Sequence, residues 1–104
     1  SKTNDRSLKM SAYWIGNVKV TDEEAYGKYA AIATVAIAEH GGKFLARGGK
    51  YEQLEGNDRS RNVLAKFPSL EAAHNCYYSE RYQEAVSHAK GACERDLVIV
   101  EGSD

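Results

Sequence analysis

The chain has 104 residues, of which 42% are hydrophobic and 28% are charged, and its 14 basic and 15 acidic side chains give a formal net charge of -1. The balanced charge argues against a nucleic-acid-binding domain, which needs a basic excess on one face. No apolar run is long enough to cross a bilayer. We therefore expect a small cytoplasmic protein that binds neither nucleic acid nor membranes.

Residues 1–10 precede the first strand-like run and lack the hydrophobic core of a signal peptide. Residue 1 is a serine, and Met10 is the chain's methionine. We expect residues 1–10 to be a flexible extension, either native or left over from protein production, and residues 11–104 to form a single domain. One domain of this size leaves much of its surface for partners to complete.

Aromatic and β-branched residues dominate 12–20, AYWIGNVKV, and predict a strand. A helix follows and runs to His40, where a glycine pair ends it. Thr21 and Asp22 both offer a helix cap, and Thr21 with Glu24 fits the capping-box pattern.

The segment 43–55, KFLARGGKYEQLE, contains two β-like pieces joined across its glycine pair. The polar stretch GNDRSR at 56–61 is expected to be a solvated hairpin connection, with a lid over a pocket as the lesser alternative. A further strand is predicted at 62–67, and it ends at the single proline, which cannot donate to a ladder.

A second helical region begins at Ser69 and is expected to break and restart at Ser79, continuing to Cys93. The run 96–102, DLVIVEG, is the closing strand. The order β-α-β-β-α-β predicts an α+β ferredoxin-like fold, with both helical regions on one face of a four-stranded antiparallel sheet.

The opposite face of that sheet is expected to be apolar as well. The alternation in the first and last strands places large apolar side chains on both faces: Trp14, Val18 and Val20 against Tyr13 and Ile15, and Leu97 and Ile99 against Val98 and Val100. A sheet that is apolar on both faces needs cover on both. We therefore predict a homodimer in which two sheets pack face to face.

Five stretches of the sequence resemble the domain of unknown function 1330 family, in the family's order and spacing. They are AYWIGNVKVTDEEAYGKYA, AIAEHGGKFLARGG, LEG, FPSLEAAHNCYYSERYQEA and DLVIVEG, and the resemblance covers about residues 11–102. The chain departs from the family at Tyr77, where tryptophan is frequent, and at Ala89 and Lys90, where an arginine is frequent. Lysine is a point charge, so a bidentate grip on an anion is not expected there.

The resemblance implies the dimeric α/β-barrel superfamily, in which two ferredoxin-like protomers join their sheets. Relatives in that superfamily include cofactor-independent oxygenases, haem-dependent enzymes, lactone isomerases and ligand-sensing domains, so the fold leaves the reaction open.

Arg47, followed by Gly48 and Gly49, is the first candidate site. An arginine at this point can project into a barrel pocket and bind a carboxylate or enolate oxygen bidentately, with the glycines letting a ligand approach the backbone. A β-bulge or tight turn that leaves Arg47 in a salt bridge is equally compatible with the sequence.

His40 is the candidate general acid or base, because its ordinary pKa lies near neutrality; the alternative is a favourable cation in the last helical turn. Trp14, Tyr78 and Tyr82 are candidate ligand-binding residues, and core or interface packing is the alternative for each. The two tyrosines are four residues apart and share a helical face.

Cys76 and Cys93 lack C-x-x-C spacing, and no clustered ligand set appears, so we expect free thiols and neither a metal site nor a cofactor. Two hypotheses of function remain. The first is a homodimer that binds a small anionic or aromatic metabolite in its pocket and carries out isomerase or cofactor-independent oxygenase chemistry with Arg47 and His40. The second is a ligand-sensing or structural dimerisation module without catalysis. A haem-binding protein is a third, weaker alternative.

Overall fold

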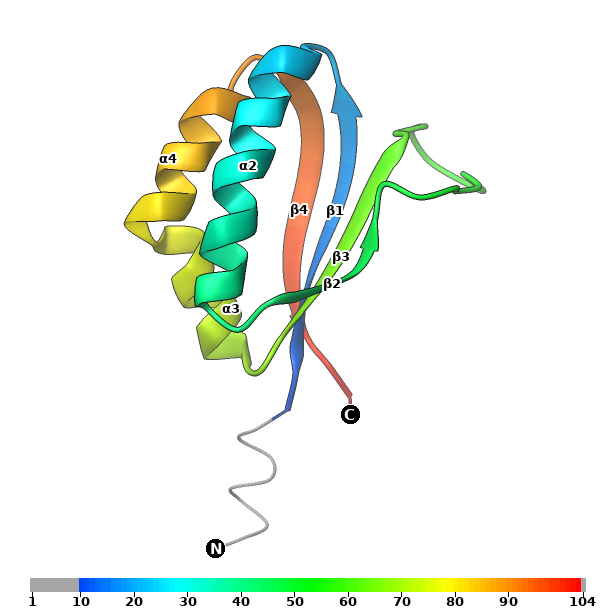
Figure 1. Ribbon diagram of the computed structural model, residues 1–104. Coiled ribbons are helices and arrows are strands. Elements are labelled where there is room, and N and C mark those ends of the chain that lie inside the picture. The colour runs from blue at the N-terminus through cyan, green and yellow to red at the C-terminus, as the bar shows by residue number, and fades with distance from the viewer. Residues whose placement is uncertain (1–9, 104) are drawn as a thin grey trace, which may run out of the picture.

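The computed structural model describes residues 10–103; residues 1–9, which make up most of the expected extension, lie outside them. Four strands form one antiparallel sheet in the order β2-β3-β1-β4, and the helices lie together on one of its faces (Figure 1). This confirms the predicted α+β ferredoxin-like arrangement. The elements are β1 (Ala12–Val20), α2 (Glu23–Glu39), β2 (Lys43–Arg47), β3 (Arg61–Phe67), α3 (Leu70–Tyr78), α4 (Glu80–Ala89) and β4 (Cys93–Glu101).

The helix starts are set by short polar side chains that accept from the first turn. Asp22 is the N-cap of α2, and its side chain accepts from the backbone N–H of Ala25 at 3.1 Å, so the predicted capping box at Thr21 is wrong. Ser69 and Ser79 cap α3 and α4 in the same way. The predicted break at Ser79 is confirmed, because one residue both ends α3 and caps α4.

The last helix ends earlier along the chain than predicted. α4 ends at Ala89, and Gly91 with a φ of 76° turns the chain into β4, which already begins at Cys93. The prediction of a helix to Cys93 is therefore wrong. The left-handed conformation at Gly91 is the one that most helix ends use to stop, and it admits glycine without strain.

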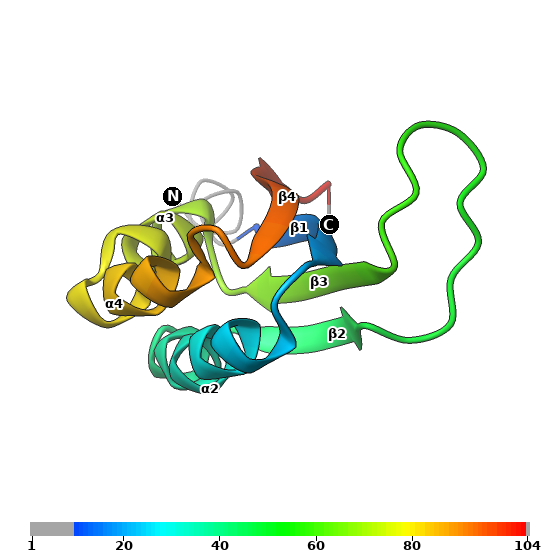
Figure 2. The same cartoon turned by 90° about the horizontal axis from the view of Figure 1, so that it is seen from above.

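The strand β2 is shorter than expected, and its break in register is not where the sequence predicted it. The register shift falls between Phe44 and Ala46, not at the glycine pair, and β2 ends at Arg47. Residues 48–60 form no strand and project away from the sheet (Figure 2). The prediction of a second β piece after the glycine pair is therefore wrong. Gly48 has a φ of 69°, and between it and the start of β3 the chain forms no strand.

Both faces of the sheet carry apolar side chains, but the helices cover only one of them. Trp14, Val18 and Phe67 lie on the helix side and are buried with the inner residues of the three helices. On the other side, Ile15 of β1 pairs with Leu64 of β3 and Val98 of β4 in one cross-strand row. Ile15 is 37% and Val98 is 53% exposed. The predicted apolar outer face is therefore present.

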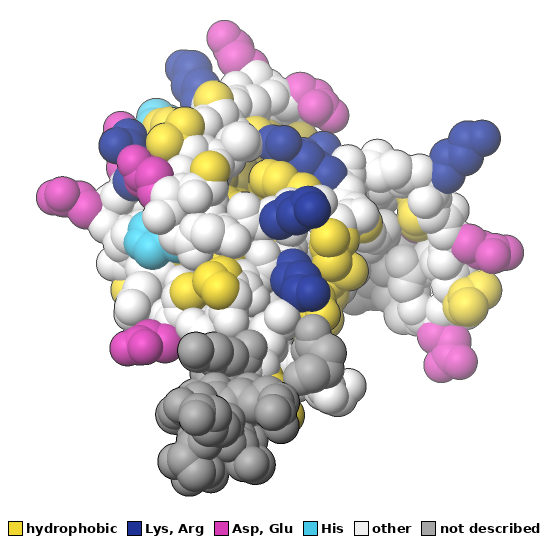
Figure 3. Space-filling model, turned by 60° about the horizontal axis from the view of Figure 1, so that its bottom comes forward, with side chains coloured by type: hydrophobic (Ala, Val, Ile, Leu, Met, Phe, Trp, Pro, Cys, Tyr) yellow, Lys and Arg dark blue, Asp and Glu magenta, His cyan; other side chains and the backbone are white. Residues whose placement is uncertain are grey.

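Within residues 10–103, no helix is long and apolar enough to span a membrane. On the side of the molecule shown in Figure 3, basic side chains gather among hydrophobic ones near the middle, whereas acidic side chains lie towards the margins.

Candidate functional site

A cavity lies between α2 and the helix-facing side of the sheet. Trp14, Gly16 and Val18 of β1 form part of its floor, and Val63 and Leu97 extend the floor onto the neighbouring strands. The volume open to the centres of water molecules is about 40 Å³, and the cavity opens to solvent. The cavity is therefore narrow, and most of its wall is apolar.

Three arginines also line this cavity, and each comes from a different strand: Arg47, Arg61 and Arg95, called the arginine cluster below. The strand register explains how two of them meet. Val18 pairs with Arg61 on one side and with Arg95 on the other, and residues that pair directly share a face of a sheet. Because Val18 is buried under the helices, both arginines must also point to the helix side.

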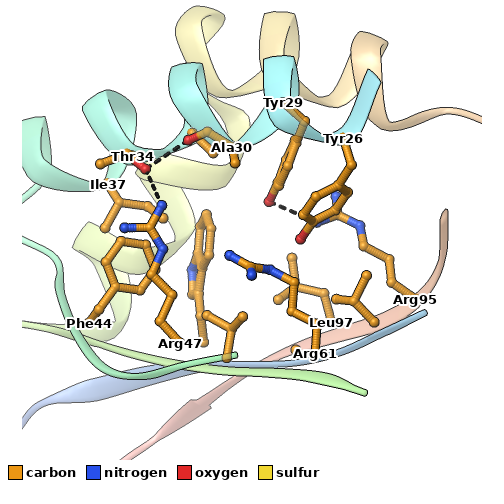
Figure 4. A pocket seen from close by; sticks show the side chains of 15 residues that line it. Tyr26, Tyr29, Ala30, Thr34, Ile37, Phe44, Arg47, Arg61, Arg95 and Leu97 are labelled. Carbon is orange, nitrogen blue, oxygen red and sulfur yellow. Dashed lines mark hydrogen bonds between the residues drawn. The ribbon is translucent and has the colours of Figure 1, made fainter. Parts of the chain in front are cut away.

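Arg47 lies at the end of β2 and reaches up to α2. Its Nη2 donates to Thr34 Oγ1 at 2.6 Å, and its Cζ lies 4.3 Å from the centre of the Phe44 ring (Figure 4). Thr34 Oγ1 in turn donates to the backbone oxygen of Ala30 at 2.7 Å. Arg47 therefore makes a hydroxyl contact and not the salt bridge that was one of its two alternatives, and this contact orients the guanidinium but leaves its charge in place.

Arg95 is held by two phenol groups. Its Nη1 donates to Tyr29 Oη at 2.9 Å and to Tyr82 Oη at 3.2 Å, and these hydroxyls contact each other at 2.7 Å. Burial, followed by the neighbouring Tyr29, raises the pKa of Tyr82 well above its ordinary value. The phenol therefore stays protonated at neutral pH and does not offset the charge of Arg95.

Arg61 lies beside Tyr26, and its hydrogen bond and its charge oppose part of the effect of burial on the pKa of that phenol. Its Nε is buried and has no hydrogen-bond partner among the described residues, and its Cζ lies 5.4 Å from the centre of the Tyr26 ring. Gly48 packs against it: a Cβ on that glycine would come within 2.8 Å of Arg61 Nη1. The guanidinium could move aside, so the positive φ of Gly48 explains the glycine that follows Arg47.

Within residues 10–103, no Asp or Glu lines the cavity. Each guanidinium of the arginine cluster lies over an aromatic ring instead, Phe44, Tyr26 or Tyr29. Aromatic rings and hydroxyls solvate a guanidinium without neutralising it. The cavity therefore carries concentrated positive charge beside apolar walls, which is the surrounding that a small organic anion needs.

The structure brings some of the sequence candidates to this cavity. Trp14 and Arg47 line it, and the Trp14 indole N–H is already donated to the backbone oxygen of Ala73 at 3.1 Å, so its ring contributes surface rather than a donor. Tyr82 reaches the site through Arg95, and Gly48 through Arg61. Gly49 has open space around its Cα, where a Cβ would meet nothing within 4 Å.

His40 and Tyr78 lie away from the cavity lined by Arg47. His40 is at the end of α2, where its Nδ1 lies 2.8 Å from the backbone oxygen of Ala36. Tyr78 is 65% exposed at the end of α3, and its ring contacts that of His74 at a tilted angle beside a second, wider groove between α3 and β4. The structure does not join Arg47 and His40 in one cavity.

Arg61 and Arg95 are site residues that the sequence reading missed. Arg61 was expected in a solvated connection, but it opens β3 and turns inward. The signal that places both arginines is the pairing of three strands around Val18, which is a property of register and not of any local motif.

Among the described residues, no group of three or more His, Cys, Asp or Glu side chains could hold a metal ion. Both cysteines are free. Burial, with a smaller contribution from Glu39, raises the pKa of the Cys76 thiol to about 12, and its Sγ donates to the backbone oxygen of Ala36. Cys76 is therefore a packed thiol and not an activated nucleophile.

Three solved structures illustrate the fold. RPA0582, a protein of unknown function from Rhodopseudomonas palustris, is 19% identical with a TM-score of 0.77, covering 100% of this chain and 95% of that one. SnoaB, a cofactor-independent oxygenase from Streptomyces nogalater, is 9% identical with a TM-score of 0.61, covering 91% and 95%. A dimeric ferredoxin-like protein of unknown function from Bacteroides fragilis is 12% identical with a TM-score of 0.60, covering 88% and 96%.

At these identities the likeness extends to the fold alone, and no curated protein matches the chain. The family comparison is more specific, because the model described as "Domain of unknown function (DUF1330)" matches residues 11–103. This match spans nearly the whole chain and confirms the resemblance noted in the sequence: the protein belongs to the DUF1330 family.

Proposed function

We propose that the protein binds a small organic anion with an apolar or aromatic body in the cavity between α2 and the sheet. One observation carries this proposal: the arginine cluster of Arg47, Arg61 and Arg95 faces the cavity without a carboxylate among the lining residues. Uncompensated guanidiniums beside apolar surface are costly to keep unless a ligand supplies the negative charge.

The arginines and tyrosines that line the cavity limit the reactions that it could catalyse. Arginine stays protonated in proteins, and burial, followed by Tyr29, raises the pKa of Tyr26, so neither type of side chain takes a proton readily at neutral pH. The cluster is suited to hold a carboxylate or to stabilise an enolate, with Arg47 in the role suggested by the sequence. His40 is outside the cavity and takes no part in this proposal.

Binding without catalysis is therefore the first form of the proposal, as in a ligand-sensing module. Cofactor-independent oxygenation is the second, because SnoaB carries that description on a similar fold and such a reaction also develops negative charge on the substrate. Oxygen consumption by the protein with an enolisable substrate would favour the second form over the first.

We also propose that two copies pack through their outer sheet faces. The row of Leu64, Ile15 and Val98 is apolar and lacks cover among the described residues, and the similar protein from Bacteroides fragilis is described as dimeric. Light scattering at micromolar concentration should give twice the mass of the chain, and Val98→Glu should yield monomers by placing like charges in the interface. A monomer in the unmodified protein would disprove this assembly.

Anion binding is tested by calorimetry with benzoate and with its neutral isostere benzamide. We expect benzoate to bind and benzamide to bind at least about tenfold more weakly, because a charge-assisted contact to arginine is worth about 1.5 kcal/mol or more. Arg61→Met should weaken benzoate binding, whereas the control Arg81→Gln should leave it unchanged, since Arg81 is paired with Glu39 on the surface. Equal affinity for benzoate and benzamide would refute the proposal.

A further inference from the structure

We infer that the ligand of this cavity is a compact dicarboxylate, with two negative charges on a short apolar body. The inference rests on the proposed anion binding and goes further by naming the charge and the class of the ligand. It is carried by the spread of the arginine cluster along α2, by the unpartnered Nε of Arg61 and by the small volume of the cavity.

The outer arginines of the cluster are fixed at separate points under α2. Arg47 is bound to Thr34, and Arg95 is bound to Tyr29, which lies five residues earlier on the helix. At 1.5 Å per residue these two contacts are about 7.5 Å apart along the helix axis. In Figure 4 the guanidinium of Arg61 lies between the other two. The positive charge thus forms a row and not a single point.

A single carboxylate is too small for such a row. It carries one negative charge and pairs best with one guanidinium, bidentately. Bound at one end, it would leave the positive charge at the other end beside apolar walls without an anion. Two carboxylates at the two ends of one small molecule would match the length of the row, and both would lie within reach of Arg61 between them.

Arg61 gives independent support for a ligand in the cavity. Its Nε is buried and has no acceptor among the described residues. A buried donor without an acceptor destabilises the folded state. An oxygen of the ligand would remove this cost, and Nε together with one Nη atom presents the parallel pair of donors that a carboxylate accepts.

The size of the cavity and the apolar character of its walls limit the segment that can join the two carboxylates of the ligand. About 40 Å³ measured to the centres of water molecules leaves no space for a large ring system. Trp14, Ile37 and Leu97 provide apolar contact along the wall. A short hydrocarbon segment between two carboxylates satisfies both conditions, whereas inorganic phosphate has the charge but offers these walls no apolar surface.

Three probes of nearly equal size and decreasing charge test this inference: succinate, its monoamide succinamate and the diamide succinamide. Calorimetry at low salt should show succinate binding at least about tenfold more tightly than succinamate, and succinamate more tightly than succinamide. Equal affinities for succinate and succinamate would overturn the dicarboxylate inference while leaving anion binding intact. Phosphate binding more tightly than succinate would overturn it as well.

The benzoate measurement distinguishes failure of the dicarboxylate inference from failure of the proposed anion binding. Benzoate binding without any preference for succinate over succinamate would remove the inference alone, whereas no binding of benzoate, succinate or phosphate would remove the proposed function and the inference together.

Arg61→Lys tests the part played by the Nε donor. Lysine keeps the positive charge but lacks the paired donors of a guanidinium. We expect the preference for succinate over succinamate to fall by about tenfold in this variant, and Arg81→Lys on the surface to leave it unchanged. An undiminished preference in Arg61→Lys, with circular dichroism confirming a folded protein, would overturn the role given to Arg61.

Discussion

Arginines in two regions of this molecule have opposite surroundings. Outside the cavity, Arg59, whose side chain is 15% exposed, donates to the exposed Asp96 at 2.7 Å. On the surface, Arg81 donates to Glu39 at 2.9 Å. In the cavity, the arginine cluster contacts aromatic rings and hydroxyls, and no carboxylate lines the same cavity among the described residues. The residue type is the same, so the difference lies in what the fold places opposite it.

An exposed ion pair such as that of Arg81 with Glu39 contributes little to stability, because water screens both charges and long side chains lose freedom when they pair. Buried guanidiniums without a counter-ion cost free energy. Arg59 and Arg81 can therefore be explained by their pairing with carboxylates, whereas the cluster would be explained by the proposed anion binding. Four changes test this comparison, from the largest expected effect to the smallest.

Arg95→Met should have the largest effect on the fold. The variant removes the donor that holds Tyr29 and Tyr82 together, and hydrogen bonds to a charged group are worth about 1.5 to 3 kcal/mol. We expect a loss of about 2 kcal/mol in the free energy of unfolding, measured by urea denaturation. Tyr82→Phe, which removes one of the two acceptors, should cost less. Unchanged stability in Arg95→Met would mean that the two phenols do not need their cation.

Alkaline pH tests whether the phenols beside Arg95 are protonated. The pKa of Tyr82 is raised by burial and by Tyr29, so the folded state keeps this proton after the unfolded state has released it. The contribution of Tyr82 to stability is therefore constant below about pH 10 and falls above it, by up to about 1.4 kcal/mol per pH unit. Cys76, with its pKa raised to about 12, adds a similar decline from about pH 9.

Urea denaturation between about pH 8 and pH 11 measures this decline, and Tyr82→Phe should remove the part that begins near pH 10. A flat profile in the unmodified protein would indicate that Tyr82 has the same pKa in the folded and unfolded states. Stability that rises with pH would indicate a lowered pKa, and a phenolate would then offset the charge of Arg95 and remove the contrast between cavity and surface.

The sequence predicted the elements because their signals are local. The alternating residues of β1 and the serine caps of α3 and α4 need no knowledge of the rest of the chain. The site was less predictable. Arg47 could be noticed beside two glycines, but Arg61 and Arg95 join it only because both pair with Val18, a register fixed by the whole sheet.

His40 shows that a residue near Arg47 in the sequence need not lie near it in the fold. Its closeness to Arg47 along the chain suggested a shared pocket, but α2 directs the cavity-lining residues Tyr29, Ala33 and Ile37 toward the sheet, and His40 follows after the helix ends. Proximity in sequence across a helix end does not fix direction in space.

Arg61→Met should raise stability. The variant keeps the length of the apolar stem, removes the buried Nε without a partner and reduces the repulsion among three like charges. The lost contact with the Tyr26 ring offsets about 0.5 to 1 kcal/mol of the gain. We expect a net increase of about 1 kcal/mol in the free energy of unfolding, together with weaker anion binding. A decrease in stability would show that the protein already satisfies this arginine.

Arg81→Gln should have the smallest effect. The side chains of Arg81 and Glu39 are 49% and 45% exposed, so their pairing is screened by water and is worth less than about 0.5 kcal/mol. Urea denaturation should not separate this variant from the unmodified protein, and added salt should not change that result. If Arg81→Gln cost as much as Arg95→Met, pairing with a carboxylate would no longer distinguish surface arginines from the cluster. The charge in the cavity would then need an explanation other than a missing ligand.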